Sequence, residues 1–79
     1  MTVAILFGIP DAKVIEDAYN IAWDYLLRSG QIANESRSHL LLSEAIVHLL
    51  ERGERHPLRL ANKAIAAYER HLADLILDL

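Results

Sequence analysis

Three side chains near the middle of the chain have the types and the spacing of metal ligands. Glu44, His48 and Glu51 follow one another at intervals of four and three residues, so a helix would place them on one face. Neutral imidazole and carboxylate groups bind several divalent metal ions. Di-iron helical bundles, however, carry a Glu-x-x-His repeat on each of two helices, and this chain lacks that repeat. We therefore expect an exposed histidine beside two carboxylates, with no metal or other cofactor, and metal binding is only a third hypothesis.

The most concentrated positive charge lies in region 49–65. It contains four of the eight basic residues, and a turn with a glycine separates two helical patterns there. The arrangement is superficially similar to a helix-turn-helix, in which helix 57–77 would enter the DNA major groove with Arg59, Asn62 and Lys63 near the base edges. The basic residues define a candidate docking face, which consists of Arg52, Arg55, His56, Arg59, Lys63 and Arg70.

The charge balance argues against nucleic acid as the partner of this docking face. The chain has 11 acidic and 8 basic residues, and its net charge of −3 gives no general attraction to nucleic acid or anionic lipid. Acidic side chains also interrupt the basic stripe, namely Glu51, Glu54, Glu69 and Asp74. We expect a solvated face or a docking site for an acidic protein, and nucleic-acid binding by helix 57–77 is the alternative.

No arrangement of residues indicates catalysis. A serine nucleophile needs a base and an oxyanion site, and the sequence shows neither beside Ser29, Ser36, Ser38 or Ser43. The three glycines are isolated, so there is no glycine-rich phosphate loop. The absence of cysteine excludes disulfides, thiolate zinc sites and cysteine nucleophiles. We expect a protein that is not an enzyme.

The apolar content is high for a chain of this length. Apolar residues make up 53% of the 79 residues, against about 45–50% in typical domains. A chain this small buries only about 60–65% of its unfolded surface, so we expect a second copy to cover the excess. The alternatives are that the N-terminal arm Met1–Ile9 or a different protein covers it. The residues that fit one core poorly define a candidate self-association surface in a homodimer, namely Phe7, Trp23, Leu40, Leu41 and Leu77.

The first ten residues predict a short apolar arm (1–10). Gly8 and Pro10 end any regular structure that begins at Val3–Phe7. No positively charged region precedes this run, so it lacks the pattern of a signal peptide. No run approaches the ~18–20 apolar residues that span a bilayer. We therefore expect a cytoplasmic protein without membrane association.

The apolar periodicity predicts three helices, over about 11–29, 35–52 and 57–77, in one domain that comprises residues 1–79. Gly30 and Gly53 can take the left-handed conformation that ends a helix, Asn34 can cap the second helix, and Pro57 suits the first turn of the third. Loops of about four to five residues make successive helices antiparallel. The predicted fold is all-α, an antiparallel three-helix bundle with up-down-up topology.

Each predicted helix has an apolar face that defines the expected core. In the third helix the apolar residues alternate at three and four residues, as in a heptad seam. The expected core residues are Ile15, Ala18, Tyr19, Ala22, Tyr25 and Leu26 in the first helix, Leu42, Ala45, Ile46, Leu49 and Leu50 in the second, and Leu58, Ala61, Ile65, Tyr68, Leu72, Leu75 and Leu79 in the third. These patterns together predict a small non-enzymatic helical protein, an interaction or regulatory module that self-associates.

Overall fold

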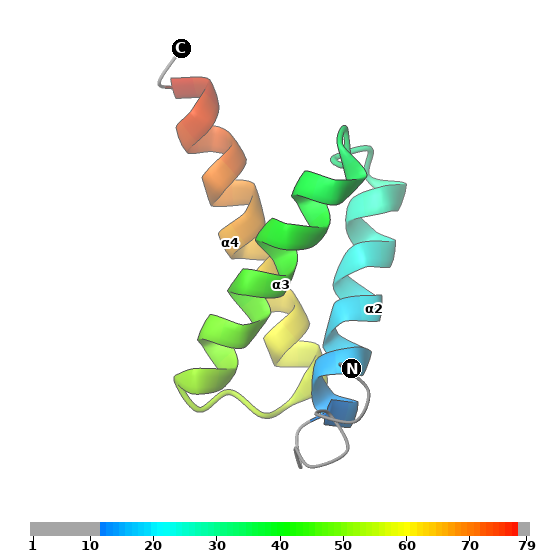
Figure 1. Cartoon of the computed structure of the whole chain (residues 1–79), viewed down its shortest axis with the longest axis vertical. Coiled ribbons are helices and arrows are strands. Elements are labelled where there is room, and N and C mark those ends of the chain that lie inside the picture. The colour runs from blue at the N-terminus through cyan, green and yellow to red at the C-terminus, as the bar shows by residue number, and fades with distance from the viewer. Residues whose placement is uncertain (1–11, 78–79) are drawn as a thin grey trace.

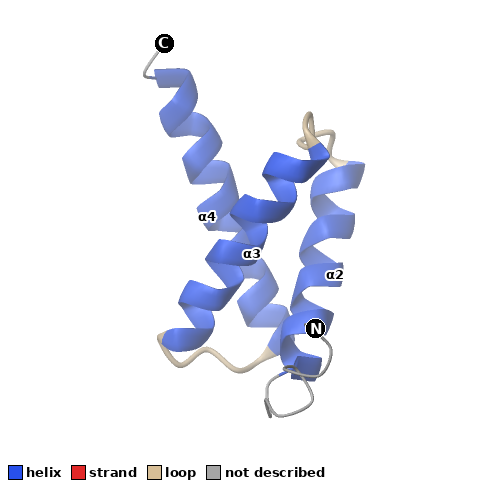
Figure 2. Cartoon of the chain, viewed as in Figure 1, coloured by secondary structure: helices blue, strands red, loops and turns tan. Residues whose placement is uncertain are grey.

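The computed structural model describes residues 12–77, and the side chains of residues 12–72. The described chain forms three helices, α2 (Ala12–Arg28), α3 (Glu35–Glu51) and α4 (Pro57–Leu77), and no strand (Figure 1 and Figure 2). Every pair of helices is in contact, so the predicted all-α three-helix bundle is confirmed. The expected arm 1–10 lies outside the described residues.

Helix α4 is the central packing element. It packs against α2 and against α3 more extensively than these two pack against each other. In Figure 1, α4 crosses behind α3 at a wide angle, and its last turns lead away from the beginning of α3. The up-down-up topology stays a prediction, because α3 and α4 cross instead of running alongside each other.

Both turns begin with a glycine that ends the preceding helix. Gly30 has a φ of 76° and Gly53 a φ of 106°, in the region that side chains with a Cβ rarely adopt. After α3, the Gly53 N–H donates to the Leu50 carbonyl (3.0 Å) and the Glu54 N–H donates to the Leu49 carbonyl (3.2 Å). These two hydrogen bonds are those of a Schellman motif.

The turn after α2 is built in the same way. The Gly30 N–H donates to the Leu27 carbonyl (3.2 Å), and the Gln31 N–H donates to the Leu26 carbonyl (3.0 Å). The chain therefore leaves α2 and α3 through equivalent motifs. In each of them, the residue after the glycine carries a polar side chain that bonds to α4.

The starts of α3 and α4 follow from the sequence. The Asn34 side chain accepts a hydrogen bond from the Arg37 N–H (3.0 Å), which satisfies one of the free donors of the first turn of α3. Helix α4 begins at Pro57, where the missing N–H costs nothing because that group has no partner in a first helical turn.

The core is built from small residues at the helix contacts and larger ones between them. Ala18 and Ala22 of α2 and Ala61 and Ala64 of α4 are fully buried, and their short side chains let these two helices approach closely. The other buried apolar residues among the described side chains are Leu26, Leu42, Ile46, Leu60 and Tyr68. Most members of the predicted core are therefore buried or half-buried.

The heptad seam predicted for α4 is wrong at its first position. Leu58 is 51% exposed, whereas Leu60, which the seam leaves out, is fully buried. Residues two apart in a helix point about 200° apart, so Leu58 and Leu60 cannot both face the core. Because α4 contacts two helices, its buried side follows Leu60, Ala61, Ala64 and Tyr68 instead of a single seam.

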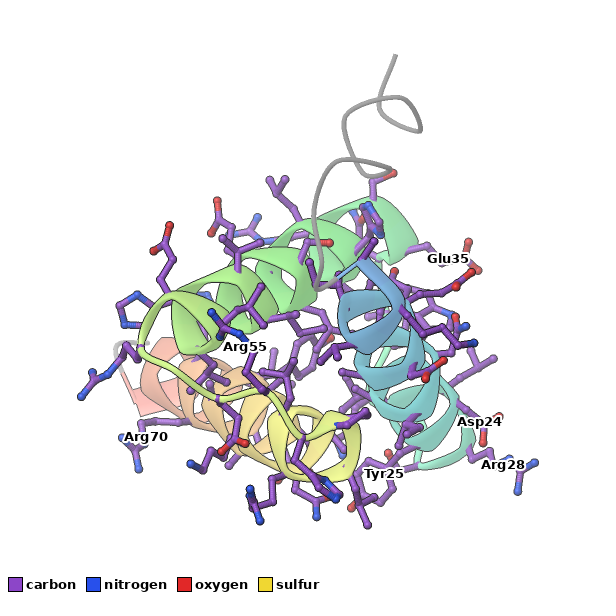
Figure 3. All side chains as sticks on the ribbon, turned by 90° about the horizontal axis from the view of Figure 1, so that it is seen from below. Asp24, Tyr25, Arg28, Glu35, Arg55 and Arg70 are labelled. Atoms are coloured by element: carbon purple, nitrogen blue, oxygen red, sulfur yellow. The ribbon has the colours of Figure 1, made fainter. Side chains whose placement is uncertain are left out.

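The predicted core position of Tyr25 is also wrong. It was expected on the core face of α2, but it is 48% exposed, and Figure 3 shows it at the edge of the bundle. Ala18, Ala22 and Leu26 alone occupy the buried side of α2. Since alanines bring α4 close to α2, a tyrosine at the edge of this contact is displaced toward solvent.

A polar network links α3, α4 and the turn after α2. The Tyr68 hydroxyl donates to the Gln31 carbonyl (3.1 Å) and is 2.7 Å from the hydroxyl of buried Ser38. The Gln31 amide in turn donates to Glu69 (2.8 Å). No buried polar side-chain atom of the described residues lacks a hydrogen-bond partner. The turn after α2 is thereby fixed to α4.

Candidate functional site

The candidate docking face is organised around one carboxylate, Glu54. The Glu54 side chain accepts hydrogen bonds from Lys63 Nζ (2.8 Å), Arg59 Nε (3.3 Å) and the His56 N–H (3.2 Å). It is only 10% exposed. The Schellman motif places Glu54 at the N-terminal end of α4, where a negative charge is favourable to the helix dipole. Two cations of the predicted face are therefore paired within the chain itself.

These contacts change the acidity of Glu54. They lower the pKa of its carboxyl from 4.5 to about 2. The hydrogen bond from Lys63 is the largest cause, and the one from the His56 N–H comes next. Partial burial acts in the opposite direction and is outweighed. Glu54 is thus ionised throughout the physiological range and provides the counter-charge for Arg59 and Lys63.

An open hollow of about 500 Å³ surrounds this ion pair, between the end of α3 and the beginning of α4. We call it the basic hollow, and its lining consists of Leu49, Arg52, Gly53, Glu54, Arg59 and Lys63. Three of the six predicted docking residues, Arg52, Arg59 and Lys63, therefore meet here. The sequence prediction treated Glu54 as an interruption of the basic stripe, whereas the structure makes it the centre.

The other three predicted docking residues are placed differently. Arg55 donates to the carbonyls of Leu50 and Glu54, and in Figure 3 it lies beside the end of α3. His56 is exposed at the start of α4. Arg70 lies eleven residues beyond Arg59, about 16 Å along the helix axis, and points away from the bundle in Figure 3. The six residues therefore do not form one continuous face.

A second open hollow, of about 520 Å³, lies at the other end of the contact between α3 and α4. Most of its lining surface is apolar, so we call it the apolar hollow. Leu40 is 60% exposed there, while Leu41 is half-buried against the core. The lining consists of Asn34, Ser36, Arg37, Leu40, Leu41 and His71. Two residues of the predicted self-association surface thus meet in one hollow.

Trp23, also predicted for that surface, lies on the other side of the first turn of α3. Its ring stacks on Tyr19, with the ring centres 5.7 Å apart and the planes at 11°. Tyr19 shares a hydrogen bond with His39 Nδ1, so one face of Trp23 is already covered by a fixed partner. A third hollow here, of about 460 Å³, includes Trp23 and shares Ser36 with the apolar hollow.

The remaining predictions for this surface cannot be placed on it. Phe7 lies outside the described residues. Leu77 ends α4, but it lies beyond the described side chains. Sequence reasoning in turn missed Arg37 and His71, which the fold brings together from α3 and α4 in the apolar hollow. No spacing signal links residues 34 positions apart, so only the helix packing reveals them.

The candidate metal ligands form no metal site among the described residues, and two of the four serines are engaged in structural hydrogen bonds. Glu44, His48 and Glu51 are exposed on α3, and no group of three or more ligand-type side chains in residues 12–72 is arranged to hold a metal ion. Of the serines, Ser38 is buried and its hydroxyl is engaged by Tyr68. Ser29 donates to the Leu26 carbonyl at the end of α2. These hydroxyls have structural partners.

None of the three helices, as far as the structure describes them, has the length and apolar character needed to cross a bilayer. Comparison of the chain with protein-family models, with curated proteins and with solved structures gives no match.

Proposed function

We propose that this chain is a small non-enzymatic interaction module that self-associates, and that the apolar hollow is the surface it uses. The observation that carries the proposal is Leu40, a large apolar side chain that is 60% exposed at the mouth of a largely apolar hollow. Apolar surface that is grouped in a concave site, with a polar rim, is typical of a protein–protein contact.

The composition supports the same proposal. The apolar content exceeds what one small core can hide, and several large apolar side chains remain exposed although the core itself is complete. Leu40 and Leu41 offer neighbouring anchors, one exposed and one fixed against the core. An anchor on a rigid helix costs little conformational entropy when it binds.

The test is Leu40→Asp, measured by size-exclusion chromatography with light scattering and by sedimentation. We expect the wild-type chain to sediment as a dimer at micromolar concentration. The variant should dissociate with a Kd about thirtyfold higher or more, because loss of a central interface anchor costs about 2 kcal/mol or more.

The matched control is Leu58→Asp. Leu58 is 51% exposed, is also an exposed leucine on a helix, and lies outside the apolar hollow. We expect this control to leave the dimer unchanged. A wild-type chain that stays at 8.9 kDa up to about 100 µM, well above the Kd of a stable dimer, would overturn the proposal. Equal dissociation of both variants would assign the contact to another surface.

A further inference from the structure

We propose that the apolar hollow receives residues 73–79 of a second copy of this chain. The inference rests on the proposed self-association and adds the segment that fills the hollow. Three features carry it: the charge on the rim of the hollow, the composition of the segment, and the place of His71.

The rim of the apolar hollow is basic and hydrogen-bonding. Arg37 is exposed and forms no ion pair with any side chain among residues 12–72. Asn34 and Ser36 lie beside it at the start of α3, where the helix dipole also favours a negative charge. Leu40 and Leu41 form the apolar part. A fitting partner is therefore an apolar segment that carries acidic residues.

Residues 73–79 have this composition. Their sequence is Ala-Asp-Leu-Ile-Leu-Asp-Leu, with five apolar residues, two aspartates and no basic residue. Leu72, just before them, packs against the core of its own chain. Asp74 and Asp78 are four residues apart, so a helix would place both on one face. Helix α4 continues through Leu77, so the segment belongs to a helix along most of its length. Its apolar residues match the leucines of the hollow, and its aspartates match the basic rim.

The place of His71 excludes the simplest alternative, in which the segment fills the hollow of its own chain. His71 lines the hollow two residues before the segment, and α4 then continues as a helix that leads away from the start of α3 in Figure 1. The segment therefore cannot turn back. In a two-fold dimer with its axis near His71, each copy would place its segment against α3 of the other.

Such a dimer contains the same contact twice. Arg37 of each copy faces the aspartates of its partner, and the leucines of the segment cover Leu40. Each hollow is incomplete without the second copy. This arrangement predicts that reversing the charge of the hollow alone, or of the segment alone, weakens the dimer. Reversing both charges should restore it.

The experiment uses two charge-exchange variants of the full chain, Arg37→Glu and the double variant Asp74→Arg, Asp78→Arg. Glutamate in the first turn of α3 and arginine in the last turns of α4 both suit the helix dipole, so both variants should fold. We expect each variant alone to dimerise with a Kd raised about tenfold or more, from like charges that face each other.

An equimolar mixture of the two variants distinguishes this contact from a general charge effect. In the mixed dimer one site pairs the glutamate introduced by Arg37→Glu with the arginines introduced in the other chain, and the second site keeps the wild-type pairing. We expect native mass spectrometry to show the heterodimer as the main dimer, with an affinity within about threefold of the wild-type value. The matched control, Arg28→Glu, changes the charge equally on α2, where Arg28 points away from the bundle (Figure 3), and should leave the Kd unchanged.

The outcomes separate this inference from the proposed function. A wild-type dimer that neither variant weakens overturns the docking of residues 73–79 and leaves self-association standing. Weakening by each variant without recovery in the mixture also overturns it, because the charges then do not pair with each other. A monomeric wild-type chain overturns both proposals.

Discussion

Two hollows open between α3 and α4, one at each end of their contact, and they differ in how the chain itself fills them. They are similar in size, at about 500 and 520 Å³. In the basic hollow, Glu54 provides the counter-charge for Arg59 and Lys63. In the apolar hollow, no described side chain covers Leu40 or pairs with Arg37.

The difference shows that a cluster of charged residues in a sequence is a weaker guide to a binding surface than an exposed side chain that the rest of the structure neither covers nor pairs with. The basic residues were the more prominent feature, but Glu54, which lies close to them in the sequence, neutralises Arg59 and Lys63. In the apolar hollow, Leu40 is left 60% exposed. We therefore propose the apolar hollow as the interaction surface, and four predictions test parts of this comparison.

The largest effect is expected from the core between the two hollows. Leu60→Ala should lower the free energy of unfolding by about 2–5 kcal/mol, because a fully buried leucine leaves a cavity when truncated. Leu58→Ala should change it by less than about 0.5 kcal/mol, since Leu58 is half exposed. Urea unfolding measures both. Similar losses for the two variants would instead support the predicted heptad seam, in which Leu58 faces the core. The two hollows between α3 and α4 would then lie at other positions.

The next effect concerns the turn that forms the basic hollow. Gly53→Ala should lower the free energy of unfolding by about 1–2 kcal/mol, because alanine is strained at a φ of 106°. A Cβ at Gly53 would meet no atom within 4 Å, so the loss measures the backbone conformation alone. Thermal unfolding checks it, and a loss below about 0.3 kcal/mol would contradict the left-handed conformation.

The acid sensitivity of the basic hollow follows from the lowered pKa of Glu54. The pKa is about 2 in the folded chain and 4.5 for an ordinary glutamate, so Glu54 stabilises the fold fully above pH 4.5. This stabilisation is lost as the pH falls from 4.5 toward 2. Glu54→Gln should remove that part of the pH dependence. Urea unfolding between about pH 7 and about pH 2.5 measures it, and parallel curves for the two proteins would contradict the assignment.

The smallest effect is expected for nucleic acid, the alternative partner of the docking face. Glu54→Gln leaves Arg59 and Lys63 without their counter-charge, so it should raise the affinity for mixed duplex DNA a few-fold at low salt. We expect the wild-type chain to bind weakly or not at all. Fluorescence anisotropy over a salt series checks both. Tight wild-type binding with a steep salt dependence would move the functional surface to the basic hollow.

Local patterns in the sequence predicted much of the fold because the responsible interactions are local. Asn34 caps α3, and Gly30 and Gly53 have a positive φ. Each depends on residues at most four positions apart. The same reasoning failed for Leu58 and Tyr25, because the periodicity of one helix does not show how many neighbours that helix has.

The candidate surfaces depended on longer-range geometry. Trp23, Leu40 and Leu41 were predicted as one surface, but the first turn of α3 separates Trp23 from the other two. Ser38 was considered only as a nucleophile without a base, and it is buried against Tyr68, thirty positions away. Such pairs have no signature in a single sequence, since nothing in the spacing of a buried serine and a tyrosine marks them as partners.

The sequence by itself determined the helices, their ends and the excess of apolar residues, because backbone conformation and composition are local or additive properties. Only the tertiary structure decided which cations Glu54 neutralises and which leucines remain uncovered, because both depend on how α4 crosses α3. That crossing brings together residues that lie far apart in the chain, such as Arg37 and His71. The candidate surface is a consequence of that packing.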